Sequence, residues 1–229
     1  MEKFGRKFKI YKNGFTLAEV LITLVIVGVV AALTIPTAIN NYRKQEYVSG
    51  LKKAYGLLSN ATNAIMYEEG SPRCDIGGWA CNSTRIANLY KKHLSVMKDC
   101  GASKDYACFE QGRPKYLSGS LVQENWGQFG GTPYKMILSN GMQIVLGDGV
   151  SSCTYDEWGG TGIKNFCKLI IVDINGSKGP NTYGRDLYYF AIKENGLFPA
   201  GSDVDGRCET TYHGWGCANK VLRENAMNY

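Results

Sequence analysis

The chain begins with a basic segment and then carries an unbroken stretch of apolar and small residues. Between Phe15 and Ile35 the only charged residue is Glu19. A helix over this range would rise about 30 Å at ~1.5 Å per residue, which is close to the thickness of a bilayer core. The pattern therefore predicts one membrane-spanning helix near the N-terminus.

After Pro36 the apolar positions recur at spacings of three and four, which is typical of an amphipathic helix. The sequence Gly70-Ser71-Pro72 is a stop signal, so we expect this helix to end near Glu69. The apolar stripe needs a surface to cover it, and the rest of the chain would supply that surface. The stripe consists of Ile39, Tyr42, Val48, Leu51, Tyr55, Leu58, Ala61 and Ile65.

The stretch from Cys74 to about Gly131 is irregular and rich in loop residues. Within it, Ile86-Ala87-Asn88-Leu89-Tyr90, together with Leu94 and Met97, predicts one short helix. The remainder of the chain alternates as strands do. Asn140-Gly141 between two apolar runs is a hairpin signal, because both residues tolerate the positive φ angles of a tight turn. The expected strands cover residues 134–138, 142–146, 166–173 and 187–192, with a turn at 194–196 into Leu197-Phe198.

These patterns together predict an α+β fold. A long N-terminal helix, half of it transmembrane, would pack against a C-terminal antiparallel sheet of about four strands. Short hairpins alone are marginally stable, so the helix and disulfide-stapled loops would complete the stability.

The net charge of the chain gives little information about its binding partners. The chain of 229 residues has a formal net charge of +6, but residues 1–14 contribute five cations and one anion. The rest of the chain therefore carries only +2, which does not favour a nucleic-acid-binding surface. The five cations before the apolar segment predict a cytoplasmic N-terminus.

All eight cysteines lie beyond the apolar segment, and an even number there predicts an oxidised, disulfide-stapled head. Many pairings are possible, and closeness in sequence favours four local ones. These are Cys74 with Cys81, Cys100 with Cys108, Cys153 with Cys167, and Cys208 with Cys217. A metal site that uses His213 and Cys217 is the alternative at the last pair.

The segment Gly14-Phe15-Thr16-Leu17-Ala18-Glu19 with the apolar helix after it resembles the class III signal of type IV pilins and type II secretion pseudopilins. The resemblance implies that a prepilin peptidase cuts after Gly14 and that the new N-terminal Phe15 is methylated. It implies that Glu19 pairs with the terminal ammonium of a neighbouring subunit. Gly28 and Pro36 match positions where the family's helix is weak and can stretch in a fibre.

This resemblance divides the chain into a cytoplasmic leader at 1–14, a filament-core helix at 15–36, an amphipathic helix at 37–69 and a Cys-rich head at 70–229. The implied partners are other pilin or pseudopilin subunits, the peptidase, an inner-membrane assembly platform and, before assembly, membrane lipid. The expected location is the bacterial inner membrane, followed by an extracellular pilus or a periplasmic pseudopilus.

The expected function is that of a structural filament subunit. An alternative is a minor or tip pilin that binds a surface or takes up DNA through exposed aromatic residues, although the small net charge makes DNA an unfavourable partner. An ordinary signal anchor, or a secretory signal cleaved near Ala31-Ala32, would not explain Glu19. No motif of an enzyme is present, so we do not expect catalysis or a required cofactor.

The loop from Asp173 to Asp186 has two interpretations. Its start, Asp-x-Asn-x-Ser, resembles an oxygen-rich calcium loop, with Asp173, Asn175 and Asp186 as candidate ligands. It departs from an EF-hand because Gly184 stands at the twelfth position in place of Glu. The alternative is a tight turn built by Asx and glycine chemistry.

Overall fold

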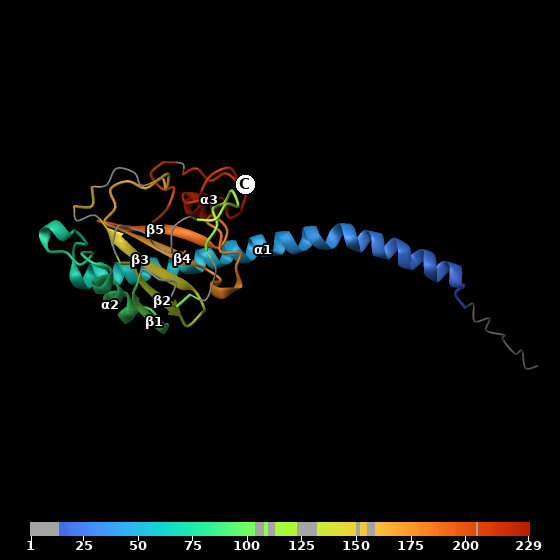
Figure 1. Ribbon diagram of the computed structural model, residues 1–229, viewed down its shortest axis with the longest axis horizontal. Helices are drawn as coiled ribbons and strands as arrows, with labels where there is room; N and C mark the ends of the chain where they lie inside the picture. The colour runs from blue at the N-terminus through green and yellow to red at the C-terminus, as the bar shows by residue number, and fades with distance from the viewer. Residues whose placement is uncertain are drawn as a thin grey trace, which may run out of the picture. The chain divides into compact units, whose positions relative to one another are not determined.

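The computed structural model describes residues 14–103, 108–109, 113–122, 132–149, 152–154, 159–204 and 206–229. By its internal contacts the chain divides into two units, residues 1–43 and 44–229. Figure 1 shows the elements in chain order. The helices are α1 (Leu17–Glu69), α2 (Ser83–His93) and α3 (Cys217–Glu224), with short 3-10 turns η1 (Cys74–Ile76) and η2 (Gly176–Lys178). The strands are β1 (Val96–Ala102), β2 (Tyr134–Leu138), β3 (Gln143–Gly149), β4 (Lys168–Asp173), β5 (Leu187–Lys193) and β6 (Gly196–Pro199).

The second unit is built on one antiparallel sheet whose six strands follow one another in sequence order. Each connection therefore joins neighbouring strands. The predicted hairpin joins β2 to β3, with Ile137 opposite Gln143 and Gly141 at a φ of 85°. Glycine suits that turn because the left-handed region costs it nothing.

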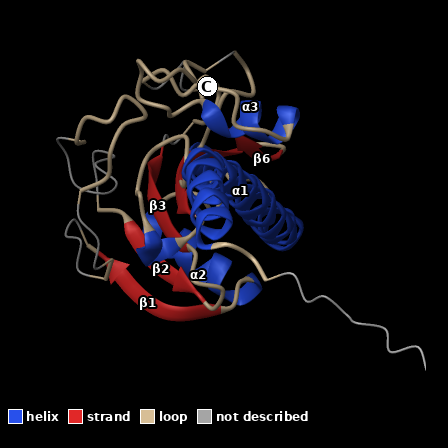
Figure 2. Ribbon diagram, turned by 90° about the vertical axis from the view of Figure 1, so that its right-hand side faces the viewer, coloured by secondary structure: helices blue, strands red, loops and turns tan. Residues whose placement is uncertain are grey.

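Both faces of the central strands are covered. Successive strand residues point to opposite faces, and Tyr189 and Phe190 of β5 show this directly. The ring of Phe190 stacks on Tyr55 of α1 at 5.8 Å, whereas the ring of Tyr189 lies 6.0 Å from Trp215 in the C-terminal segment. All of β4 is buried for the same reason. Figure 2 shows α1 alongside the sheet.

Helix α1 follows its predicted stripe only within the second unit. Its buried residues recur at spacings of mainly three and four, and they are Val48, Leu51, Ala54, Leu58, Ala61, Thr62 and Ile65. Ile39 and Tyr42, which the pattern placed on the stripe, lie in the first unit and are 46% and 71% exposed.

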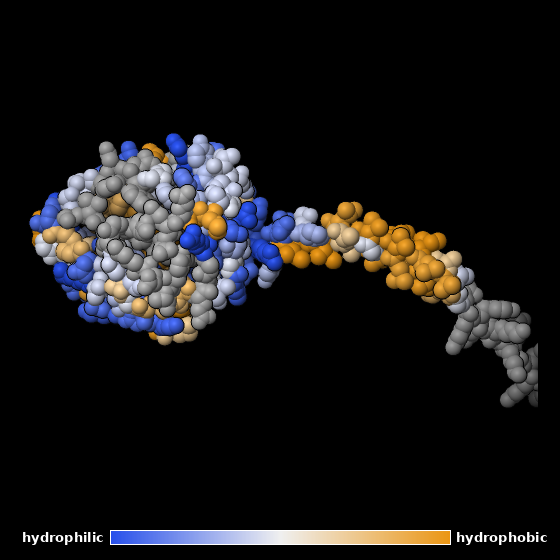
Figure 3. All heavy atoms as spheres, viewed as in Figure 1, coloured by the Kyte–Doolittle hydropathy of each residue, from blue (hydrophilic) through white to orange (hydrophobic). Residues whose placement is uncertain are grey.

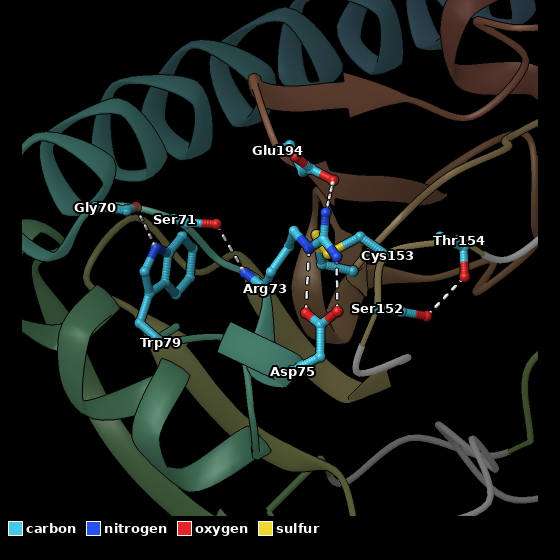
Figure 4. The surroundings of a disulfide bond; sticks show 10 residues. Gly70, Ser71, Arg73, Asp75, Trp79, Ser152, Cys153, Thr154 and Glu194 are labelled. Carbon is cyan, nitrogen blue, oxygen red and sulfur yellow. Dashed lines mark hydrogen bonds and ion pairs between the residues drawn. A yellow bond between two sulfur atoms is a disulfide. The ribbon is translucent and has the colours of Figure 1, made fainter. Parts of the chain in front are cut away.

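The end of α1 is fixed by the segment that follows it (Figure 4). Gly70 has a φ of 77°, and the indole nitrogen of the fully buried Trp79 donates to the Gly70 carbonyl at 3.1 Å. The guanidinium of Arg73 contacts Asp75 at 2.6 Å and Glu194, beside β6, at 3.5 Å. These contacts bring the segment after the helix next to the β5–β6 turn.

Two expectations from the sequence need correction. The sheet has six strands instead of about four, and Met97 belongs to β1 and not to the short helix, which ends at His93. Strand β1 is an edge strand with exposed side chains, so it lacks the alternation that marks a half-buried strand. The C-terminal segment contains the helix α3, which the sequence patterns above do not predict.

Candidate functional site

The first of the predicted site residues lie where α1 begins. The Thr16 backbone N–H and hydroxyl both donate to Glu19 Oε2, at 2.8 and 2.7 Å, and the Glu19 N–H donates to Thr16 Oγ1 at 3.2 Å. This reciprocal pair is a capping box, which satisfies backbone donors at a helix start. Glu19 therefore has partners within its own chain, a role that the sequence interpretation missed although Thr-x-x-Glu is its known signature. Gly14 and Phe15 precede the helix, and Phe15 is 88% exposed.

The apolar residues after Glu19 form a surface with almost no burial inside the chain. The most hydrophobic window of α1 has a mean hydropathy of 2.6, and none of it is buried. Figure 3 shows this surface in orange. By length and composition the helix could cross a membrane. The exposed apolar residues include Leu17, Leu21, Leu24, Val27, Val30, Leu33 and Ile35.

Gly28 and Pro36 both lie inside α1, which continues through them. Proline lacks the N–H that would bond to the carbonyl four residues earlier, so one ladder bond is missing at this position. A β-carbon added to Gly28 would meet nothing within 4 Å. The two positions are thus compatible with local weakness of the helix, which remains a prediction.

The cysteines form three disulfides in the second unit: Cys100–Cys108, Cys153–Cys167 and Cys208–Cys217. The fourth pair expected from the sequence is not formed, since Cys74 and Cys81 are thiols. The Cys81 thiol is exposed and donates to the Gly78 carbonyl at 2.9 Å. Burial, aided by hydrogen bonding with Cys81, raises the pKa of Cys74 to about 12.

The alternative metal site at the last cysteine pair is wrong. Cys217 is bonded to Cys208, so its sulfur is not a thiolate ligand. The His213 ring stacks on Trp215 with centroids 4.6 Å apart. Within the described ranges, no group of three or more His, Cys, Asp or Glu side chains is placed to hold a metal ion.

The loop from Asp173 to Asp186, called here the 173–186 loop, connects β4 to β5. Asp173 Oδ1 accepts hydrogen bonds from the backbone N–H groups of Asn175 and Gly176, at 3.1 and 2.8 Å. Asp186 accepts from the N–H groups of Asn181 and Thr182, at 2.8 and 2.6 Å. The structure thus places all three predicted ligands in one loop. Asn181, which the sequence interpretation did not consider, joins them through its N–H bond to Asp186, and calcium binding stays a prediction.

Comparison with protein families gives one match, to the prokaryotic N-terminal methylation motif, over residues 10–35. Comparisons with curated proteins and with solved structures gave no match. The matched range contains Gly14, Phe15, Glu19 and Gly28. It coincides with the capping box and most of the exposed apolar surface. The chain therefore carries, at its N-terminal end, the prepilin-type signal of type IV pilins and pseudopilins.

Proposed function

We propose that the protein is a structural subunit of a type IV pilus or a type II secretion pseudopilus. One observation carries this proposal: a helix surface that is apolar and exposed along its length begins directly after the predicted cleavage site. An apolar surface of this size in a soluble monomer is a liability. Lipid covers it before assembly, and the same helices of other subunits cover it in a filament.

In this proposal Glu19 gives the helices their register. A carboxylate in an apolar environment is costly unless it is paired. Cleavage after Gly14 creates an ammonium at Phe15, and methylation preserves its positive charge. The ammonium of one subunit then pairs with Glu19 of another, while the second unit forms the outer surface.

Mass spectrometry of the N-terminal peptide tests the proposal, with protein purified from membranes of the native bacterium. The expected first residue is Phe15 carrying an N-methyl group. In a Gly14→Val variant, changed only at the cleavage glycine, the peptidase should not cut. The purified chain should then still carry the leader at residues 1–14. A wild-type chain that starts at Met1, or beyond Ala31, would contradict the proposal. The recovery of the processed chain in surface fibres or in the periplasm would then distinguish pilus from pseudopilus.

A further inference from the structure

Two of the eight cysteines are thiols in a unit whose other six cysteines form disulfides. Cys74 and Cys81 both lie in the segment between the end of α1 and the start of α2. Their side chains hydrogen-bond with each other, so the two sulfur atoms are close together. Cys81 is exposed, whereas Cys74 is half-buried. One sulfur of a neighbouring pair is therefore open to solvent, and the other lies beside it.

The backbone of this segment holds the two cysteines together. Three backbone hydrogen bonds of 2.6–3.3 Å join residues 71–73 to residues 78–80. Cys74 directly follows the first of these stretches and Cys81 directly follows the second. A β-carbon added to Gly78 would lie 2.3 Å from the Ser71 carbonyl oxygen, so the two stretches are in close contact. A bond between the two sulfurs would thus close a turn that the backbone has already formed.

Exposure separates this pair from the three disulfides. Of the six cysteines in disulfides, Cys100 is half-buried and the other five are buried. Thiol–disulfide exchange requires access to a sulfur atom, and exposed pairs are the ones that exchange readily. Exchange in the second unit would therefore begin at Cys81.

The two thiols also differ in reactivity. Burial, aided by the hydrogen bond with Cys81, raises the pKa of Cys74, although the positive charges of Lys168 and Arg85 act in the opposite direction. Because the thiolate is the nucleophile, Cys74 reacts slowly with a reagent from solution. Once the Cys81 sulfur belongs to a mixed disulfide, however, Cys74 lies next to it, and proximity favours the intramolecular step.

We propose that Cys74 and Cys81 are a redox-sensitive pair that undergoes thiol–disulfide exchange with an external disulfide. The Cys81 thiolate attacks one sulfur of that disulfide, and the other sulfur leaves as a thiolate and takes up the proton that Cys81 lost. Cys74 then attacks the Cys81 sulfur, and its proton goes to the second sulfur that is released. The pair is oxidised to one disulfide, and the external disulfide is reduced to two thiols.

Closure of the pair would connect the end of α1 to the start of α2. On the α1 side, the Trp79 indole nitrogen donates to the Gly70 carbonyl at 3.1 Å. On the α2 side, Asn82 follows Cys81, and its side chain accepts from the Arg85 N–H at 2.7 Å as the helix cap. A disulfide restricts the unfolded chain, so the closed form should unfold at a higher temperature than the open form.

The test uses the full chain in detergent, brought to the state with two free thiols by limited treatment with dithiothreitol. Intact mass and thermal unfolding are measured before and after incubation with glutathione disulfide. We expect the loss of two hydrogen atoms, no retained glutathione and an unfolding temperature that is several degrees higher. Dithiothreitol at a concentration that leaves the other three disulfides closed should reverse these changes. A chain that keeps both thiols, or that opens only together with the other disulfides, would overturn the proposal.

Two variants test the order of the steps. In Cys74→Ser the exposed Cys81 can still attack, but nothing resolves the mixed disulfide, so one glutathione should stay bound at Cys81. In Cys81→Ser the remaining thiol at Cys74 should react with glutathione disulfide roughly tenfold more slowly. Equal rates in the two variants would contradict an entry through Cys81. If either variant does not fold, the mass change of the wild-type chain still decides whether the pair closes.

The double variant Cys74→Ser with Cys81→Ser is the control for the unfolding temperature. It should unfold at the same temperature with glutathione disulfide and with the low dithiothreitol concentration, because no sulfur in this segment can exchange. A shift equal to that of the wild-type chain would assign the change to another disulfide and overturn the role of this pair. The N-terminal mass, which tests the filament proposal, is independent of these results.

Discussion

At the scale of single residues, Glu19 caps its own helix through Thr16, and the proposed filament adds a second, separable role for its carboxylate. Thr16 supplies two hydrogen bonds to its carboxylate, which lowers the cost of placing that charge at the start of an apolar helix. Cleavage after Gly14 would leave Thr16 with both its N–H and its hydroxyl. The box therefore survives processing, and the carboxylate can still accept from a further donor, because an ionised carboxylate has about four acceptor sites.

Two substitutions separate these roles. Glu19→Ala removes the charge and the carboxylate's half of the capping box, while the backbone N–H of residue 19 can still donate to Thr16 Oγ1. We expect normal processing but strongly reduced incorporation into filaments. Thr16→Val removes the hydroxyl, at a cost of about 1 kcal/mol of helix capping, but keeps the carboxylate for a neighbouring ammonium. It should incorporate close to the wild-type level. Immunoblots of filament and membrane fractions measure the amount of subunit in filaments relative to the amount in membranes. Normal filament yield from Glu19→Ala would exclude the pairing role, and equal losses in both variants would assign the defect to the cap.

At the scale of elements, the segment between α1 and α2 differs most from expectation. The sequence predicts a Cys74–Cys81 disulfide, whereas the structure has two thiols among three formed disulfides. The thiolate is the reactive form, so the raised pKa of Cys74 makes that residue slow to react, while the exposed Cys81 should react first.

Alkylation with iodoacetamide before any reduction checks this arrangement. In the native protein we expect label on the Cys81 peptide, and after denaturation on the Cys74 peptide also. The six cysteines in disulfides should gain label only after reduction, which serves as the internal control. If Cys74 and Cys81 both stay unlabelled in denaturant until reduction, the local pairing suggested by the sequence is the correct one.

Elements with a strong local signal could be predicted, and those defined by distant contacts could not. Asn140-Gly141 identifies its hairpin because the turn conformation depends on those two residues, and the Asn140 side chain accepts from the Met142 N–H at 3.1 Å. Strand β1 gives no such signal because its side chains are exposed and its register with β2 shifts twice. In the same way, Asp173 and Asn175 follow a motif, whereas Asn181, at a φ of 54°, meets Asp186 through a backbone hydrogen bond that no sequence pattern indicates.

At the scale of the whole molecule, one continuous helix meets two different environments. Leucines before Lys44 are exposed in the first unit, as Leu33 is at 73%, whereas Leu58 in the second unit is 1% exposed. The sequence predicts both parts of α1. A helix that is apolar on all sides is typical of contact with lipid or other helices, and a helix with one apolar stripe is typical of packing against a sheet. The pattern does not determine the residue of α1 at which burial begins. That position depends on where the sheet and the C-terminal segment contact the helix.

A pair of identical substitutions tests this division. Leu58→Ala leaves a cavity in the hydrophobic core and should lower the free energy of unfolding of the second unit by about 2–5 kcal/mol. Leu33→Ala removes the same atoms from an exposed position and should leave that free energy unchanged. Urea unfolding of the full chain in detergent, followed by near-UV circular dichroism from the second unit's aromatic residues, measures both. An equal loss in the two variants would mean that residues before Lys44 unfold together with the second unit, and the helix would then be one cooperative element instead of two.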